Sequence, residues 1–288
     1  MVSGTTETIL TMTHASLFSG IGGFDLAAEW AGWTNVFNCE IDSFCRKVLK
    51  YHFPDAEQYE DIKKSDFSKW RDRIDVLTGG FPCQPFSLAG KRKGTDDDRY
   101  LWPAMLGVIR TVRPQWVVGE NVYGIVNWSE GMVFDTVCSD LEAEGYEVQP
   151  YIIPACGVGA PHRRDRCWFV AHRADTGIET MREGKDGLYA DEFVAHADVQ
   201  RFEKCNASEK SSQTQERLAQ NGNEKRRILD WSGFPTESPV CDRDDGFPGE
   251  LAGISFPAWC RESIKACGNA IVPQVAFQIF KTIEEYEK

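Results

Sequence analysis

Apolar and polar residues alternate in a repeating way between residues 13 and 171. Short apolar runs at 15–17, 75–78 and 116–118 have the length of strands, and stretches such as 26–30 between them suit helices. Strands that alternate with helices form a parallel sheet covered on both faces. The pattern therefore predicts an α/β fold with a doubly wound, mostly parallel sheet.

The alternation stops after residue 172. From residue 173 to about 227 apolar residues become sparse, and Ser, Gln, Asn, Glu and Lys dominate. Such a span is too polar to bury a core of its own. We expect it either to become ordered only with a partner, or to form a small loop-rich module on the main domain.

The end of the chain returns to a helical pattern. Pro273 suits a first helical turn, where its missing N–H does no harm. Apolar residues follow at helical spacing, and we interpret their stripe as ordinary core packing: Val275, Ala276, Ile279, Phe280 and Ile283. The predicted divisions are a main domain, a small variable region and a C-terminal segment that returns to the main domain: 13–172, 173–262 and 263–288.

Cys83 is the first candidate for chemistry. It stands in the turn Gly79–Ser87, rich in Gly and Pro, directly after the run 75–78. A thiol at a strand end is held rigidly and suits a nucleophile, provided that a lowered pKa or a nearby base yields the thiolate. The alternative is a buried structural cysteine.

Three further strand ends strengthen the first interpretation. The glycine-rich turn Phe18–Leu26 lies between a strand and a helix, an arrangement that brings backbone against a nucleotide-like ligand. Glu40 ends the next apolar run, twenty residues after Gly20, where a carboxylate can accept ribose hydroxyls. Glu120 ends a later run, and a parallel sheet would bring it to the same edge as Cys83.

Together these segments resemble the DNA cytosine-5 methyltransferases that use S-adenosylmethionine. The matching motifs run in the family order from Phe18 to Pro273, and they include Pro82-Cys83-Gln84 and Glu120-Asn121-Val122. The resemblance implies a Rossmann-like methyltransferase fold with a small second recognition domain. It also implies transfer of a methyl group to carbon 5 of a flipped cytosine in double-stranded DNA, through a covalent cysteine adduct.

The resemblance assigns roles residue by residue. It implies a catalytic role for four residues: Cys83, Glu120, Arg164 and Arg166. It implies cofactor contacts, with Asp61 at the adenine amino group, for a larger set: Phe18, Gly20, Gly22, Gly23, Glu40, Ile41, Asp61, Ile62, Pro82, Asn269 and Ile271. The chain departs from the family where His162 replaces a glutamine, and where no copy of the Arg- and Glu-containing segment before the last motif is found.

Charge bears on the DNA partner. The net charge of −12 argues against general affinity for nucleic acid, although a local basic surface can override it. We expect DNA contacts from the loop after Cys83, from the arginines around Arg164, and from a basic run whose alternative is a solvated face. The residues outside the catalytic set are Ser87, Lys91, Arg92, Lys225, Arg226 and Arg227.

The remaining expectations concern location and partners. The sequence has no run of 18 apolar residues, no start typical of a signal peptide, and ten cysteines without a Cys-x-x-Cys pair. We expect a monomer without a metal site in the reducing cytoplasm of a prokaryote or of a phage host, and no membrane association. A cognate restriction endonuclease is a candidate partner. The alternatives are a tRNA cytosine-5 methyltransferase and an inactive DNA-binding homologue.

Overall fold

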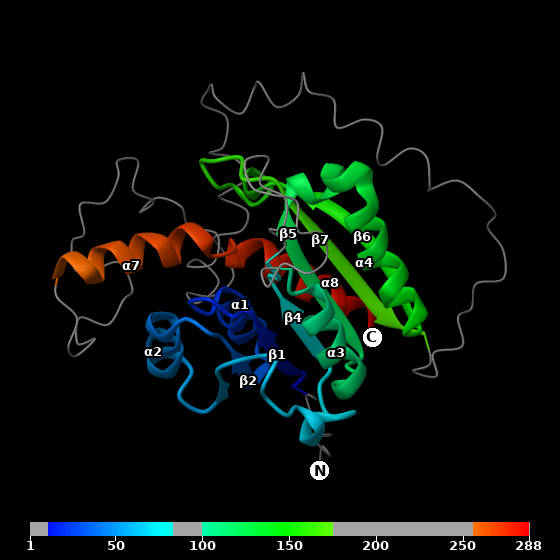
Figure 1. Cartoon of the computed structure of the whole chain (residues 1–288), viewed down its shortest axis with the longest axis horizontal. Helices are drawn as coiled ribbons and strands as arrows, with labels where there is room; N and C mark the ends of the chain where they lie inside the picture. Colours follow the sequence, from blue (N-terminus) through cyan, green and yellow to red (C-terminus); the bar gives the residue numbers. More distant parts are fainter. Residues whose placement is uncertain (1–10, 83–99, 175–255, 288) are drawn as a thin grey trace, which may run out of the picture. The chain divides into compact units, whose positions relative to one another are not determined.

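The computed structural model describes residues 11–82, 100–174 and 256–287 (Figure 1). Every described helix and strand belongs to one compact unit. The predicted division at 13–172, 173–262 and 263–288 stays a prediction. Within the described ranges, no helix combines the length and apolar character needed to cross a membrane.

The described strands are β1 (Thr13–Leu17), β2 (Thr34–Cys39), β3 (Glu57–Tyr59), β4 (Val76–Gly79), β5 (Trp116–Val122), β6 (Tyr146–Ile153) and β7 (Arg166–Arg173). The α-helices are α1 (Gly23–Ala31), α2 (Ser43–His52), α3 (Trp102–Val112), α4 (Met132–Ala143), α7 (Phe256–Asn269) and α8 (Pro273–Tyr286). The short 3₁₀ segments are η1 (Ser68–Trp70), η3 (Tyr123–Gly131) and η4 (Ala155–Val158).

The strands form one mostly parallel sheet in the order β3-β2-β1-β4-β5-β7-β6. β3, β2, β1, β4 and β5 are parallel, whereas β7 runs antiparallel between β5 and β6. The chain moves outward from β1 to β3 and then resumes at β4 on the other side of β1. This change of direction opens a crevice at the carboxyl ends of β1 and β4, where ligands bind in open α/β sheets. The predicted fold class is confirmed.

Helices cover both faces of this sheet (Figure 1). One core cluster joins the sheet to α3 and α4 through Met105, Ile109 and Leu141. The other joins it to α1 and α8 through Phe24 and Phe280. Because both faces are covered, the central strand β4 is buried at all four of its positions.

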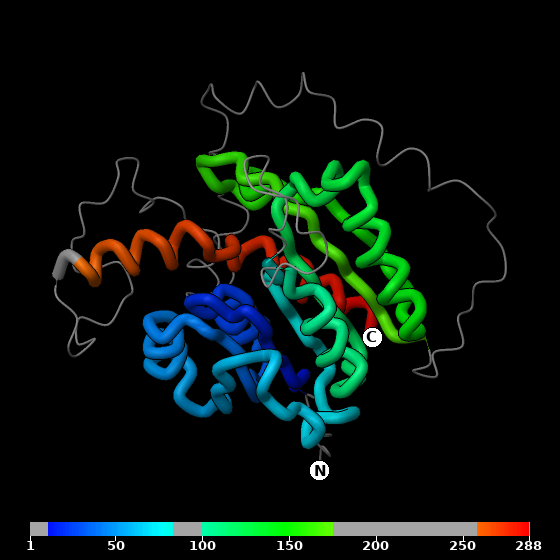
Figure 2. Tube along the Cα trace, viewed as in Figure 1, coloured from blue at the N-terminus to red at the C-terminus, as the bar shows by residue number. Residues whose placement is uncertain are grey.

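The C-terminal helix closes the second face. The predicted stripe is buried, which confirms its interpretation as core: Val275, Ala276, Ile279, Phe280 and Ile283. α8 lies beside α1 although the two are distant in sequence (Figure 2). The Phe280 ring stacks on Trp33 with 4.5 Å between centroids, and Trp33 Nε1 donates to Glu284 Oε1 at 2.8 Å. Residues of and just after α1 therefore share one core with α8.

A buried polar group supports the turn after β1. Asp25 has no solvent exposure, and its carboxylate accepts from Ser16 Oγ at 2.9 Å. Ser16 Oγ is 2.7 Å from Ser19 Oγ, which in turn accepts from the N–H of Cys39 at 3.1 Å. Burial raises the pKa of Asp25 to about 7, although the bond from Ser16 acts in the opposite direction. The chain Asp25–Ser16–Ser19 thus fixes the glycine-rich turn to the end of β2.

This burial gives a pH-dependent prediction. The pKa of Asp25 is raised from 3.8 to about 7. Protonation of Asp25 therefore stabilises the folded state fully below pH 3.8, and this stabilisation is lost as the pH rises toward 7. Asp25→Asn cannot titrate. The free energy of unfolding of the wild type, relative to this variant, should therefore fall by up to about 1.4 kcal/mol per pH unit within that window. Urea unfolding across the window measures it, and a pH-independent difference would contradict it.

Candidate functional site

A large cavity lies at the carboxyl ends of the parallel strands. Its volume is about 840 Å³, within the range of small-molecule sites. Its walls come from the segments after β1, β2, β3 and β4, from the end of β5, from the turn before β7 and from α7. Its lining includes Phe18, Gly20, Glu40, Ile41, Asp42, Cys45, Asp61, Ile62, Pro82, Glu120, Arg164, Arg166, Glu262, Lys265, Ala266 and Asn269.

The glycine-rich turn after β1 lines the cavity with Phe18 and Gly20. Phe18 and Gly20 have φ values of 53° and 55°, in the left-handed region, so the chain reverses sharply after β1. A Cβ on Gly23 would lie 2.7 Å from the Ile271 side chain. Glycine is therefore required there for the C-terminal segment to pack against the turn.

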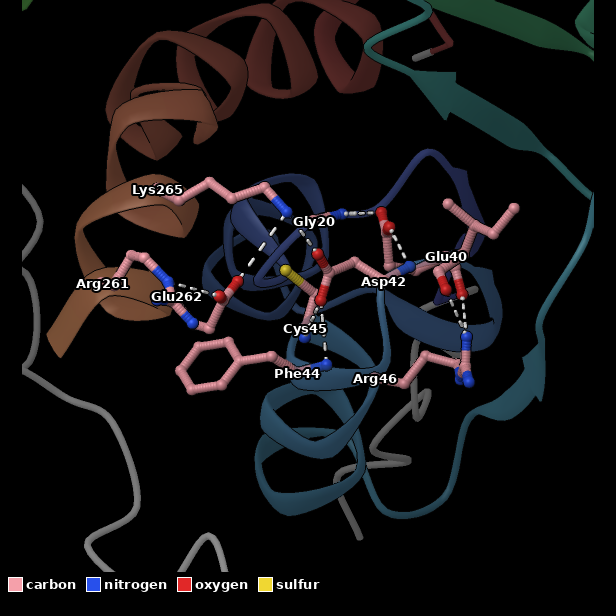
Figure 3. Close-up of polar contacts among 10 residues, drawn as sticks. Gly20, Glu40, Asp42, Phe44, Cys45, Arg46, Arg261, Glu262 and Lys265 are labelled. Carbon is pink, nitrogen blue, oxygen red and sulfur yellow. Dashed lines mark hydrogen bonds and ion pairs between the residues drawn. The ribbon is translucent and has the colours of Figure 1, made fainter. Parts of the chain in front are cut away.

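Glu40 joins the turn to the end of β2 (Figure 3). Its Oε2 accepts from the N–H of Gly20 and its Oε1 from the N–H of Asp42, both at 2.8 Å. Arg46 donates to the carbonyl oxygens of Glu40 and Ile41 at 3.1 and 2.7 Å. A carboxylate has about four acceptor positions, so Glu40 keeps two of them for a ligand. Ile41 beside it is 68% exposed, which presents an apolar surface to the cavity.

Asp61 brings a second carboxylate to the cavity, at the end of β3. Its Oδ1 accepts from the N–H of Lys63 at 2.9 Å, and its Oδ2 pairs with Lys64 at 3.1 Å. The backbone bond from Lys63, followed by the bond from Lys64, lowers the pKa of Asp61. The group is therefore an ionised hydrogen-bond acceptor at neutral pH, with apolar Ile62 next to it.

Glu120 stands at the end of β5 in a different environment. Its carboxylate pairs with Arg166 Nε at 2.9 Å, and its side chain is only 12% exposed. Burial raises the pKa of Glu120 to about 7, against the opposing effect of Arg166 and Arg164. The group can therefore hold a proton near neutral pH, as a general acid or hydrogen-bond donor requires.

Asn121 ties this strand end to the neighbouring one. Its Nδ2 donates to the carbonyl oxygen of Phe81 at 2.8 Å, which fixes the turn containing Pro82 beside Glu120. Cys83 follows directly but lies outside the described residues, as do Ser87, Lys91 and Arg92. The basic run is also outside them: Lys225, Arg226 and Arg227.

Arg164 connects the cavity to the C-terminal segment. Its Nη2 donates to the carbonyl oxygens of Gly268 and Ala270 at 3.0 and 2.6 Å. Its φ of 41° is uncommon for a residue with a side chain. This arrangement holds Asn269 at the cavity wall, while Ile271 packs against the glycine turn. Arg164 thus contacts the loop of the last motif.

Most of the described residues that the sequence singled out meet in this cavity. Gly22, Gly23 and Ile271 do not line it, and they support it from behind through packing. Sequence reasoning missed Asp42 and Lys265, which also line the wall. Asp42 had a signal, because it follows Glu40 closely and precedes an amphipathic helical stretch. Lys265 had none, because its partner is 223 positions away.

Comparison with known proteins places the chain in a family. A model of the C-5 cytosine-specific DNA methylases matches residues 12–244. The chain therefore belongs to the C-5 cytosine-specific DNA methylase family, and the resemblance seen in the sequence is confirmed.

Individual relatives agree with this assignment. Type II methyltransferase M.Eco47II of Escherichia coli is 36% identical over 166 residues, covering 57% of this chain and 40% of the relative. Type II methyltransferase M.HpaII of Haemophilus parainfluenzae is 34% identical over 191 residues, covering 65% and 52%. The chain thus spans about half the length of the curated relatives it matches.

Solved structures support the fold alone. The crystal structure of S. pombe Dnmt2 methyltransferase has a TM-score of 0.61 at 15% identity, covering 96% of this chain and 100% of that one. A Spodoptera frugiperda DNMT2 mutant has a TM-score of 0.60 at 19% identity, covering 94% and 99%.

The Glu120–Arg166 pair yields a prediction that needs no assay of activity. Arg166 opposes the effect of burial on the pKa of Glu120, so Arg166→Met should raise that pKa above its wild-type value. Carboxyl ¹³C NMR titration measures it, and Glu120→Gln identifies the resonance. An unchanged or lower pKa in Arg166→Met would show that the two side chains do not interact in solution.

Proposed function

We propose that this chain transfers a methyl group from S-adenosylmethionine to carbon 5 of a flipped cytosine in double-stranded DNA. One observation carries the proposal. The same cavity holds an oriented carboxylate with unused acceptor positions, Glu40, and a buried carboxyl paired with an arginine, Glu120 with Arg166. The first suits a nucleoside-like cofactor and the second suits a base with ring nitrogen and carbonyl groups. Family membership supports the same reaction.

The wall near Glu40 fits the cofactor. Glu40 would accept the ribose hydroxyls, Asp61 would accept from the adenine amino group, and Ile41 with Ile62 would contact the faces of the ring. Phe18, Gly20, Pro82 and Asn269 would surround the remainder, since all of them line the same cavity. When bound, S-adenosylmethionine supplies the methyl group.

The chemistry falls to Cys83 and Glu120. Attack of the Cys83 thiolate on carbon 6 of cytosine forms a sulfur–carbon bond and moves electron density toward carbon 5. Protonated Glu120 would donate to ring nitrogen 3 and stabilise that charge. Carbon 5 would then take the methyl group, whose bond to the sulfonium sulfur breaks, and S-adenosylhomocysteine would be left. Loss of the carbon 5 proton to a base reforms the double bond and expels the Cys83 thiolate, which leaves 5-methylcytosine.

The arginines would hold the base and the cofactor wall. Arg166 is the candidate for the cytosine carbonyl oxygen, because it stands beside Glu120. Arg164 would support the site indirectly, through the loop that carries Asn269. A cytosine inside a duplex cannot reach either group, so the base must leave the stack.

Recognition of the DNA would fall to the remaining regions. We propose that residues 173–262 carry sequence choice and that Ser87, Lys91 and Arg92 contact DNA near the flipped base. The run Lys225–Arg227 would contribute phosphate contacts. The names of the relatives, type II methyltransferases, make a cognate restriction endonuclease a candidate partner.

The covalent step can be tested directly. Cys83→Ser should lose methylation, because an alcohol at neutral pH is a far weaker nucleophile than a thiolate. Wild type should form a denaturation-resistant complex with a random-sequence duplex library containing 5-fluorocytosine, because fluorine cannot leave as a proton. Cys138→Ser, on α4 away from the cavity, is the matched control and should be trapped like wild type. Trapping of Cys83→Ser would refute the assignment of the nucleophile.

The cofactor assignment predicts a separate effect. Glu40→Gln and Asp61→Asn each remove the negative charge and replace one acceptor oxygen of the carboxylate by an N–H₂ donor. Each should therefore weaken binding of S-adenosylhomocysteine by about 1.5–3 kcal/mol and leave DNA binding unchanged. Calorimetric titration measures the affinity. Asp66→Asn is the control, because Asp66 caps an exposed turn through the N–H of Ser68 and does not line the cavity. Unchanged affinity in both test variants would move the cofactor elsewhere.

A further inference from the structure

α7 supplies a wall of the cavity that no catalytic motif accounts for. Glu262, Lys265 and Ala266 line the cavity from this helix. Opposite them stand Asp42 and Cys45, at the start of α2 (Figure 3). The ligand space next to Glu40 therefore lies between α2 and α7, and its width depends on how these two helices are held together.

The apolar part of this contact is small. The buried cluster between the helices consists of Phe44, Cys45, Val48 and Ala266, with Ile21 and Trp259 packed against it. α7 contributes two side chains to this contact, the buried Ala266 and the partly buried Trp259. The apolar contact from α7 thus rests on few side chains, and we expect polar groups to have a measurable share in docking α7.

The polar part centres on Lys265. Its Nζ lies 2.7 Å from Asp42 Oδ2 and 3.8 Å from Glu262 Oε2. Asp42 Oδ1 at the same time accepts from the N–H groups of Phe44 and Cys45, at 2.9 and 3.3 Å. Burial acts to raise the pKa of Asp42, but the bonds from Lys265 and from these two N–H groups outweigh it and lower the pKa. Asp42 is therefore ionised. It caps the N-terminus of α2 and forms an ion pair with Lys265 on α7.

Lys265 also offsets the repulsion between carboxylates that surround it. The adjoining walls carry carboxylates on both sides, with Glu40 and Asp42 on one and Glu262 on the other. Lys265 stands between Asp42 and Glu262. Without its ammonium group, these two carboxylates would repel each other across the cavity, so α7 would lose an attraction and meet a repulsion.

We infer that Lys265 is a positioning residue for the cofactor, which fastens α7 across the cofactor pocket through its ion pair with Asp42. The inference rests on the proposed function, because it takes the cavity to be the site of S-adenosylmethionine. If α7 is docked in only a fraction of the molecules, the apparent affinity for the cofactor falls in proportion to that fraction. Lys265 should therefore affect cofactor binding and leave the chemical step unchanged.

The experiment is a double-mutant cycle on S-adenosylhomocysteine binding, measured by calorimetry. Lys265→Met keeps the aliphatic stem, and Asp42→Asn keeps a side chain that caps helices well. Since Lys265 is 57% exposed and Asp42 27%, Lys265→Met should raise the dissociation constant about threefold to fivefold. Lys265→Arg should restore most of the affinity. The double variant should bind more tightly than the product of the single effects implies, because the repulsion is also removed.

Two further measurements separate positioning from a general loss of structure. At saturating cofactor, kcat of Lys265→Met should equal that of wild type while KM for the cofactor rises. Lys281→Met is the matched control, because Lys281 pairs with Glu284 on α8 and does not line the cavity; it should leave both parameters unchanged.

The outcomes distinguish this inference from the proposed function. Equal affinity of wild type and Lys265→Met, additive effects in the cycle, or a lower kcat with unchanged affinity would each overturn the role of Lys265 and leave the proposed function standing. If wild type itself does not bind S-adenosylhomocysteine, the proposed function fails and the inference fails with it.

Discussion

The parallel pairing of β2, β1, β4 and β5 is the constraint on which the site depends. It brings the ends of strands that are far apart in sequence to one edge of the sheet. The glycine turn, Glu40, Pro82 and Glu120 then line one cavity without any further folding. The bonds from Gly20 to Glu40 and from Asn121 to Phe81 lock neighbouring strand ends together. The first bond orients the Glu40 carboxylate, and the second fixes the turn that carries Pro82.

Two carboxyl groups in the cavity behave differently because their surroundings differ. Asp61 receives a backbone N–H and a lysine, which lower its pKa. Glu120 is buried, and this raises its pKa to about 7 even with Arg166 beside it. A group that stays ionised suits binding of a cofactor amine, whereas a group that can hold a proton suits a base that gains negative charge. Both residues are acids, and their surroundings therefore favour different proposed roles for Asp61 and Glu120.

The sheet and most of the cavity could be predicted because their signals in the sequence are local. An apolar run followed by a glycine-rich turn, as at Phe18–Leu26, or by an acid, as at Glu40 and Glu120, marks a strand end on the ligand side of a parallel sheet. The pairing of Lys265 with Asp42 could not be foreseen, since it depends on how a helix near the C-terminus returns to α2. The contact of Arg164 with backbone carbonyl groups of the last motif was hidden because such groups carry no signal in a sequence.

We propose that this edge of the sheet directs a methyl group to carbon 5 of cytosine in DNA. The most direct measurement supplies S-adenosylmethionine with a tritiated methyl group to the protein, with duplex DNA and tRNA in parallel reactions. The nucleic acids are then digested and the nucleosides are separated by chromatography. We expect label in 5-methyldeoxycytidine from DNA. Label confined to tRNA, label in another nucleoside, or no label in either reaction would contradict it.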